Sequence, residues 1–341
     1  YVPPKILQLA FSPDSQHLAV MDDHCCCTLF KIDYQYRNMN KAKEWIFSGK
    51  LKIHKQPLRG IAFGESQRIS DKQDQPETYL RLFSVSEDKH LVEYDVSKSN
   101  NNRLCEKYII PIEQETNPCA VIWYPVNKFK EDILMVINED YKIKLWNVSD
   151  DTKYTKKTCL GPTYGGPINR LLVINTPKDN EKYLAYSTNN KVIGLIKLPA
   201  DGNPHNNMGL IAHPDEITGI ATSSDGNFLF TSGGADFTVN MWHVDIGTME
   251  QTMLNTGDAM DPFIDLLEGG HEGQLLRDLK DFFYYSQIRS KDENTTKFRK
   301  LEGMVPLNEL ANLMRALGYY PTNKEIENMM REVEFSKFPD D

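Results

Sequence analysis

The sequence predicts an all-β propeller of about five four-stranded blades, followed by a small all-α domain. In the first region, a unit made of an apolar strand, a polar turn with an acidic residue and a second strand recurs several times. In the last region, apolar residues return at helical spacing instead, as at Leu310, Leu313, Met314 and Leu317. We therefore expect propeller blades in residues 1–256, a linker in 257–273 and a helical domain in 274–341.

The repeat is anchored by one acidic or amide residue in each turn, and these anchors are Asp23, Asp88, Asp140, Asn190 and Asp236. A bulky residue follows each anchor six positions later: Leu29, Tyr94, Trp146, Ile196 and Trp242. The anchors lie 46 to 65 residues apart, which is the length of one blade. Most propellers close with more blades, so either polypeptide before Tyr1 supplies the rest, which we favour, or a partner completes an open ring. We also expect residues 248–254 to form the outer strand of the last blade.

The turn residues resemble those of the WD-repeat β-propeller family, in which a hydrogen-bonded set of His, Ser or Thr, Asp and Trp locks each blade. The last repeat carries such a set as His213, Ser232, Asp236 and Trp242. The second has His54, Ser84 and Asp88, with Tyr94 in place of Trp, and the third matches in part through Asp140 and Trp146. The resemblance implies scaffold roles. A hydrolase is disfavoured because the Ser lies within a strand and not on a strained strand-to-helix turn.

The C-terminal helices resemble a calmodulin-type EF-hand pair. Gly318 and Pro321 separate two amphipathic segments, and Thr322 with Glu325 forms a capping box at the start of the second. A calcium loop at Phe298–Glu309 lacks its ligands, since its first, third and ninth positions are Phe, Lys and Pro. We therefore expect no metal there, and we expect the helix before the loop to present Leu275, Leu276, Leu279, Phe282 and Phe283 on one face.

Composition excludes several classes of function. A net charge of −9 argues against nucleic-acid binding through a bulk basic surface, and no apolar run is long enough to span a membrane. Six cysteines occur without a Cys-x-x-Cys pair, so a zinc site is not expected. No phosphate-binding loop or acid–base pair is recognisable, so we expect no enzyme and no cofactor. A calcium sensor, or an enzyme or small-ligand binder using the central channel, are the alternatives from other classes.

The order of elements narrows the resemblance further. A propeller followed by DPFIDLLEGGHEGQLLRDLKDFFYYSQIRS and two more helices is similar to the WD-repeat subunits of the ciliary calmodulin- and spoke-associated complex. The resemblance implies a non-enzymatic axonemal scaffold at the base of a radial spoke, the third one, that contributes to regulation of ciliary motility. The implied partners are calmodulin, the other subunits, radial spoke proteins and the doublet microtubule neighbourhood. A general WD-repeat adaptor outside cilia is the further alternative.

The two C-terminal helices also predict a binding surface. We expect an apolar groove that clasps a partner's helix, with calcium sensitivity supplied by bound calmodulin. The candidate groove residues are Leu310, Leu313, Met314, Leu317, Met329 and Met330. If they instead form the domain's own core, substituting them will unfold the domain rather than weaken assembly.

Overall fold

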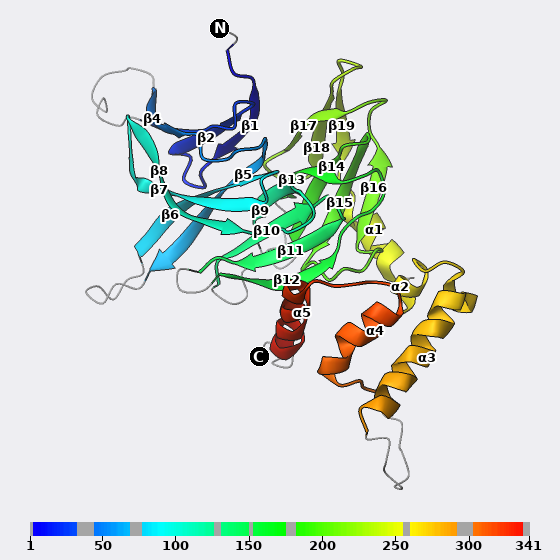
Figure 1. The fold of residues 1–341 in the computed structure, drawn as a ribbon. Coiled ribbons are helices and arrows are strands. Elements are labelled where there is room, and N and C mark those ends of the chain that lie inside the picture. The colour runs from blue at the N-terminus through cyan, green and yellow to red at the C-terminus, as the bar shows by residue number, and fades with distance from the viewer. Residues whose placement is uncertain are drawn as a thin grey trace. The chain divides into compact units, whose positions relative to one another are not determined.

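The structure is a computed structural model, and it describes residues 3–32, 44–68, 77–125, 131–149, 153–174, 182–254, 260–291 and 303–336. These residues form two compact units. The first holds most residues up to Ile246, and the second holds residues from Gly247 onward together with Thr155–Thr158 and Asn203–His205. The strands belong to the first unit, apart from residues 155–158, and the helices belong to the second unit, apart from Ile246 (Figure 1).

The first unit is built of five antiparallel sheets, which we number as blades 1 to 5. Blade 1 contains β1 (Ile6–Phe11), β2 (His17–Asp22), β3 (Cys27–Ile32) and β4 (Trp45–Leu51). Blade 2 contains β5 (Leu58–Arg68), β6 (Glu77–Ser86), β7 (His90–Asn100) and β8 (Arg103–Pro111). Blade 3 contains β9 (Pro118–Trp123), β10 (Ile133–Asn138), β11 (Lys142–Asn147) and β12 (Tyr154–Leu160). Blade 4 contains β13 (Ile168–Ile174), β14 (Lys182–Thr188), β15 (Val192–Leu198) and β16 (Asn207–Ile211). Blade 5 contains β17 (Ile217–Thr222), β18 (Phe228–Gly233) and β19 (Val239–His243).

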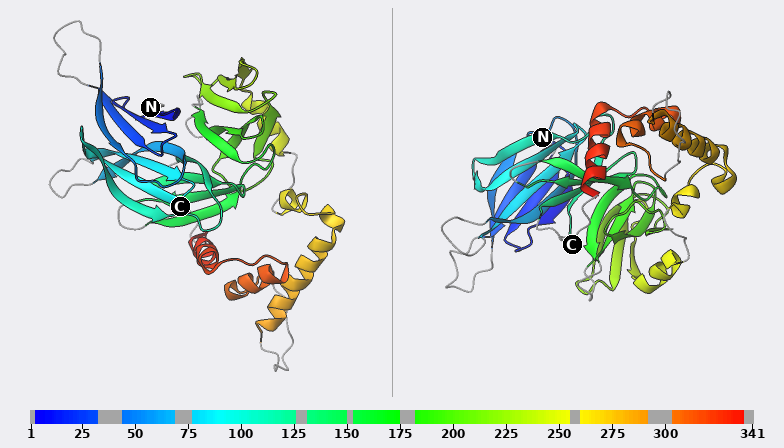
Figure 2. Two further views of the ribbon diagram at one scale, coloured as in Figure 1. Left: turned by 45° about the horizontal axis from the view of Figure 1, so that its top comes forward. Right: turned by 90° about the horizontal axis from the view of Figure 1, so that it is seen from below.

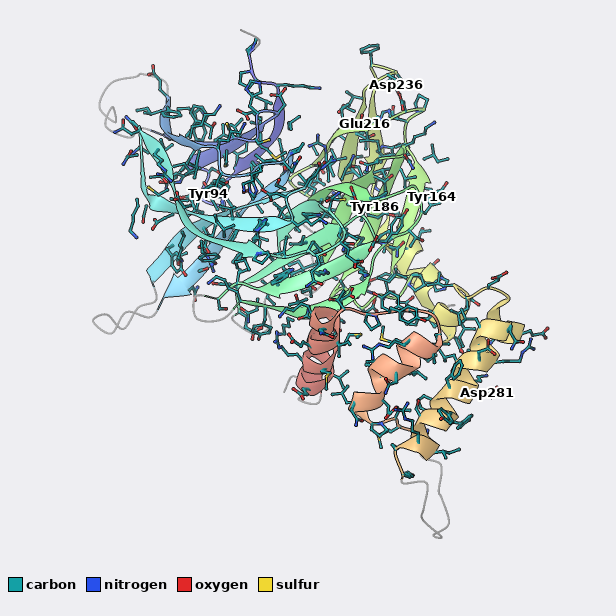
Figure 3. All side chains as sticks on the ribbon, viewed as in Figure 1. Tyr94, Tyr164, Tyr186, Glu216, Asp236 and Asp281 are labelled. Atoms are coloured by element: carbon teal, nitrogen blue, oxygen red, sulfur yellow. The ribbon has the colours of Figure 1, made fainter. Side chains whose placement is uncertain are left out.

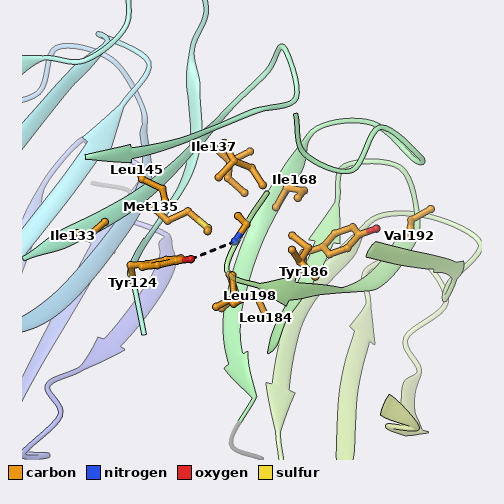
Figure 4. Close-up of a cluster of buried hydrophobic side chains, with 13 residues drawn as sticks. Tyr124, Ile133, Met135, Ile137, Leu145, Ile168, Leu184, Tyr186, Val192 and Leu198 are labelled. Carbon is orange, nitrogen blue, oxygen red and sulfur yellow. Dashed lines mark hydrogen bonds between the residues drawn. The ribbon is translucent and has the colours of Figure 1, made fainter. Parts of the chain in front are cut away.

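The five blades predicted within this chain are therefore confirmed. Neighbouring blades pack face to face through apolar side chains, which the two-residue periodicity of each strand directs to the same face. One buried cluster joins blades 1 and 2, a second joins blades 2 and 3, and a third joins blades 3 and 4. In the third, Met135 and Ile137 from β10 meet Leu184 and Tyr186 from β14 (Figure 4). Because burying one such side chain stabilises the fold by about 1.5–3 kcal/mol, these clusters hold the blades together.

The turn of each repeat has the same backbone geometry. The residue after the anchor has a positive φ in four blades, at Lys89 (66°), Tyr141 (60°), Lys191 (73°) and Phe237 (54°). In blade 1 the corresponding left-handed residue is Cys25 (63°). A non-glycine residue rarely adopts this conformation, so its recurrence shows that the five turns are copies of one structural unit.

The end of the propeller differs from the prediction. Residues 248–254 were expected to form a strand, but they lie in helix α1 (Ile246–Leu254), so that prediction is wrong. Met249 is buried and Ile246 lies three residues before it, a spacing that places both side chains on one helical face. The change from strands to helices thus comes earlier than the expected boundary at residue 256. Within the described part of the expected linker 257–273, the chain folds into α2 (Asp261–Ile264) and a 3₁₀ turn, η1 (Gly270–Glu272).

The second unit contains the predicted C-terminal helices. These are α3 (Gln274–Arg289), η2 (Leu307–Glu309), α4 (Leu310–Ala316) and α5 (Asn323–Ser336), and α3 packs against α4. The capping box is confirmed, since Glu325 N–H donates to Thr322 Oγ1 at 3.3 Å and Thr322 N–H donates to Glu325 Oε2 at 2.9 Å. Gly318 ends the preceding helix with a φ of 89°. Among the described residues, no helix is both long and apolar enough to cross a membrane.

Candidate functional site

A chain of hydrogen bonds locks blade 5 around the imidazole of His213. Its Nδ1 lies 2.8 Å from Asp236 Oδ2 and its Nε2 lies 2.8 Å from Thr231 Oγ1. Because a carboxylate only accepts, Nδ1 carries a proton, and in the neutral imidazole Nε2 accepts from the Thr231 hydroxyl. Trp242 Nε1–H then donates to Thr231 Oγ1 at 3.0 Å. Asp236 lies at the turn, as Figure 3 shows.

The hydroxyl in this network is that of Thr231 and not that of Ser232, so the assignment of Ser232 is corrected. Ser232 lies on the opposite face of β18, where its hydroxyl is 3.1 Å from that of Thr218. The cause is the length of the turn. The hydroxyl residue of blade 2 precedes its Asp by four positions, whereas glycines 233 and 234 lengthen the turn of blade 5 by one residue. A shift of one residue in a strand reverses the face of every side chain.

Blade 2 holds the matching network with Tyr94 in the place of Trp. His54 Nδ1 lies 2.9 Å from Asp88 Oδ2, and His54 Nε2 lies 2.8 Å from Ser84 Oγ. The Tyr94 hydroxyl lies 2.9 Å from Ser84 Oγ and is buried in the blade (Figure 3). Burial lowers the pKa of His54 below its usual value, and Asp88 only partly offsets this effect. The imidazole is therefore neutral at pH 7, as its acceptor role toward Ser84 requires.

The carboxylate at the blade 5 turn is held by two donors. The hydrogen bond from His213, followed by that from Thr238, lowers the pKa of Asp236 to about 2. Thr238 Oγ1–H donates to Asp236 Oδ2 at 2.8 Å. The carboxylate thus remains charged throughout the physiological pH range and fixes the turn by accepting hydrogen bonds.

Blade 3 does not bring Asp140 and Trp146 into such a network. The Asp140 side chain is half exposed, and Trp146 is buried with no partner for Nε1 among the described residues. A different set replaces it: Lys144 Nζ lies 2.6 Å from Glu113 Oε2, and Asn138 Nδ2–H donates to Glu113 Oε1 at 3.3 Å. The repeat pattern of the sequence did not predict this set. Asn138 occupies the position of Ser86 in the repeat, so aligning the blades strand by strand is the signal that finds it.

A buried ionic cluster that the sequence pattern did not predict joins blades 2 and 3. Arg81 on β6 is fully buried and binds Glu93 through two parallel hydrogen bonds of 2.8 and 2.7 Å. Its guanidinium also donates to Asp132 Oδ2 at 2.9 Å and to the Val148 carbonyl at 2.7 Å, both in blade 3. A buried guanidinium needs such partners to offset its desolvation, so this cluster fixes the two blades against each other. An isolated Arg between strand residues gives no sequence signal of this kind.

These sites have the chemistry of a scaffold. Each imidazole and hydroxyl of the two His networks is engaged with another side chain of its own blade, and none is aimed into open space. Within the described ranges, no group of three or more His, Cys, Asp or Glu side chains is placed to hold a metal ion. The residues Phe298, Lys300 and Glu302 of the predicted degenerate calcium loop lie outside the described residues.

Three of the six candidate groove residues lie on α4, Leu317 caps the C-terminal end of α4, and the two methionines Met329 and Met330 lie on α5. Leu310, Leu313, Met314 and Leu317 are half-buried, as are Met329 and Met330. None of the six belongs to the three buried clusters, all of which lie between blades. Glu309, which precedes α4, accepts a hydrogen bond from Asn312 at 3.3 Å. The surfaces of α4 and α5 are thus partly accessible to solvent.

Repeated blades, their turn geometry and the His networks define the class: the chain contains a WD-repeat β-propeller, followed by a small helical domain. Residues 206–243 match the family model "WD domain, G-beta repeat", a segment that runs from the end of blade 4 through β19. Residues 274–341, which include α3, α4 and α5, match the model "CFAP251 C-terminal domain".

Curated relatives resemble the chain across both regions. The chain is 51% identical to cilia- and flagella-associated protein 251 of Tetrahymena thermophila over 99% of its own length and 35% of the relative's. It is 35% identical to the protein of that name from Mus musculus, over 99% of the chain and 25% of the relative. For the Pongo abelii protein the identity is 33%, over 98% of the chain and 28% of the relative. The chain thus spans about a third or less of the length of the curated relatives it matches.

Proposed function

We propose that the protein is a non-enzymatic structural component of the cilium or flagellum, built into the axoneme. One observation carries the proposal: similarity to proteins named for cilia and flagella extends over 98–99% of the chain, across the propeller and the helical domain alike. A likeness limited to the WD repeat would support only the fold, because propellers host many functions. The helical domain supplies the specific part, since it matches a model named for the same protein.

The finer proposal places the protein in the calmodulin- and spoke-associated complex at the base of the third radial spoke. There it contributes to regulation of ciliary motility together with calmodulin and radial spoke proteins. The half-buried apolar side chains of α4 and α5 are the surface that we assign to a contact with calmodulin. In this account calcium acts through calmodulin, and the propeller holds its neighbours in fixed positions.

The rigidity that such a role needs is present in the propeller. Buried clusters and the Arg81 cluster fix blades 1 to 4 against one another, so partner surfaces on the rims of these blades keep a constant geometry. The helical domain would add an adaptable surface. Methionine side chains fit varied apolar partners because they are flexible and polarizable, and Met314, Met329 and Met330 are half-buried on α4 and α5.

Proximity labelling in motile cells tests the location. A biotin ligase fused to the endogenous protein is expected to label radial spoke proteins, calmodulin and other axonemal proteins when the cilia are isolated afterwards. A free ligase targeted to cilia is the control. Labelling of cytoplasmic or trafficking proteins alone contradicts the proposal and favours an adaptor outside cilia.

Substitution of the groove tests the partner surface. Met329→Glu is expected to reduce recovery of complex subunits in a pull-down while the thermal unfolding midpoint of the protein stays near that of the wild type. Glu327→Gln, on an exposed position of the same helix, is the matched control. Loss of the helical domain's unfolding transition in Met329→Glu would show that the residue belongs to the domain's own core.

A further inference from the structure

The outer edge of blade 4 differs from the outer edges of blades 1 to 3. A strand at the edge of a sheet presents unpaired backbone groups, and native proteins normally protect such an edge with charged side chains, proline or a β-bulge. The outer strand β8 carries Arg103, Glu106 and Lys107, and the outer strand β12 carries Lys156 and Lys157. The outer strand β4 is interrupted by a shift in its register with β3, as at a β-bulge.

The outer strand of blade 4, β16, has none of these protective features. Its sequence NMGLI contains no charged residue and no proline, and it pairs with β15 in an unbroken register. It is the outermost strand of its sheet (Figure 1; Figure 2, left). Leu210 is 50% exposed and Ile211 is 64% exposed. Because successive side chains of a strand point to opposite faces, each face of this edge exposes one large apolar side chain.

Every second residue of β16 directs its backbone polar groups away from the sheet. Ala212, which follows the strand, donates its N–H to the Lys191 carbonyl at 2.8 Å. Hydrogen-bonded pairs alternate along an antiparallel ladder, so the N–H and C=O groups of Gly209 and Ile211 point outward. Among the residues that the structure describes, these outward groups have no hydrogen-bond partner.

Two tyrosines support this edge from one face of the sheet. The Tyr186 ring lies against Gly194 of β15, and its hydroxyl donates to the Met208 carbonyl at 3.2 Å. Gly209 leaves room for both rings, since a Cβ there would lie 3.0 Å from Tyr186 Oη and 3.2 Å from Tyr164 Cδ1. Figure 3 labels the two tyrosines in this part of the sheet. The edge is therefore held in place, while its backbone remains open to pairing.

We propose that β16 is a docking site for an extended segment of another protein, which pairs along this edge as a fifth strand of blade 4. The outward N–H and C=O groups match the backbone of a strand, whereas a helix has already used its own backbone groups internally. The segment is apolar in its middle, where it covers Leu210 and Ile211. It is basic at the end next to Asp215 and Glu216, which follow β16 with exposed side chains. A net charge of −9 disfavours a second copy of the chain in this place. The proposal does not depend on the ciliary role.

Site-specific photo-crosslinking in the whole gene product tests the proposal. A photo-reactive amino acid replaces Leu210 through the endogenous gene, and crosslinked peptides are identified by mass spectrometry. The same amino acid in place of Ile109, which is 49% exposed on the charged outer strand β8, is the matched control. An epitope-tagged copy without the photo-reactive residue is expressed in the same cells, so that a crosslink between copies carries the tag.

Three variants at position 211 separate strand pairing from other contacts. Ile211→Pro removes an outward N–H, and Ile211→Lys adds a charge of the kind that protects β12, so each is expected to lower the crosslink yield from position 210 by about tenfold. Ile211→Ala keeps the N–H and adds no charge, so it is expected to retain most of the yield. Because the Ile211 N–H is not used by β15, the thermal unfolding midpoint of all three variants is expected to stay near that of the wild type. If the proline variant unfolds, the lysine variant carries the test.

The expected product joins position 210 to one short segment of another protein, with alternating apolar residues and a basic residue at one end. A crosslink to the same polypeptide or to the tagged copy overturns the proposal. So does a segment whose apolar residues have the spacing of a helix, or a yield no higher than that at position 109. Equal yields from Ile211→Lys and Ile211→Ala overturn it as well, because they show that the edge itself is not used.

Discussion

Removal of the guanidinium of Arg81 is expected to destabilise the propeller strongly. Arg81→Met leaves the Glu93 carboxylate, which is 1% exposed, without its bidentate partner, and it removes the hydrogen bonds to Asp132 and the Val148 carbonyl. Breaking a buried ion pair from one side costs about 3–5 kcal/mol. Lys107 remains 3.3 Å from Glu93, so we expect a value near the lower end, about 3 kcal/mol.

The assay is unfolding in urea, monitored by tryptophan fluorescence. Trp146 is buried in blade 3 and Trp123 lies at its contact with blade 2, so both report on the region that Arg81 holds. Since the chain has two units, the shift is measured on the midpoint of the propeller transition alone.

Two further variants make the test specific. Arg81→Met with Glu93→Met removes both charges, and it is expected to recover much of the loss because no unpaired buried charge remains. Arg59→Met removes the partner of Glu87 in a pair whose Arg is 45% exposed, and it is expected to cost about 0–1 kcal/mol. The reasoning is refuted if Arg81→Met costs no more than Arg59→Met, or if the double variant is less stable than the single one.

Three other predictions follow from the blade networks and from α4. Thr231→Val should cost about 1–3 kcal/mol because it leaves the buried His213 Nε2 and the half-buried Trp242 N–H without their partner, whereas Ser232→Ala should change stability by less than about 0.5 kcal/mol in the same urea assay. Thermal stability should fall as the pH drops from about 6.5, where the unfolded chain takes up a proton that buried His54 resists, and fall again between about 4 and 2 as Asp236 protonates. Calorimetry checks both stages. Asp236→Asn should reduce the lower stage without removing it, because the pKa values of Asp22, Asp88 and Asp95 are lowered as well, and it should leave the upper stage unchanged. Met314→Glu should lower the amount of calmodulin recovered with the protein but leave far-ultraviolet circular dichroism unchanged, and equal recovery would exclude α4 from that contact.

The repeat made much of the propeller predictable. The anchor spacing located all five turns, and in four of them the left-handed residue directly follows the acidic or amide anchor; in blade 1 it lies two residues after Asp23. The same spacing assigned the wrong hydroxyl, Ser232 instead of Thr231, because the turn of blade 5 contains one more residue than the turn of blade 2. It also failed for residues 248–254, where helical packing of Met249 outweighed an expectation based on completing the blade. The sequence pattern thus predicts the regular blade, but it does not predict where one blade departs from the others in turn length or in its last strand.

The features that the sequence did not predict are long-range ones. Arg81 joins residues 51 and 67 positions away, at Asp132 and Val148, and no periodicity connects them. In blade 3 the Glu113–Lys144 ion pair takes the position that a His network has in blades 2 and 5. A search for His, Ser or Thr, Asp and Trp therefore does not find it.

Cryo-electron microscopy of isolated axonemes, with the endogenous protein carrying a structural tag, tests the proposed ciliary role most directly. We predict density for the propeller and tag at the base of the third radial spoke on the doublet microtubule, lost together in cells that lack the gene. The proposed function is contradicted if no spoke base carries the tag although the tagged protein is abundant elsewhere in the same cells.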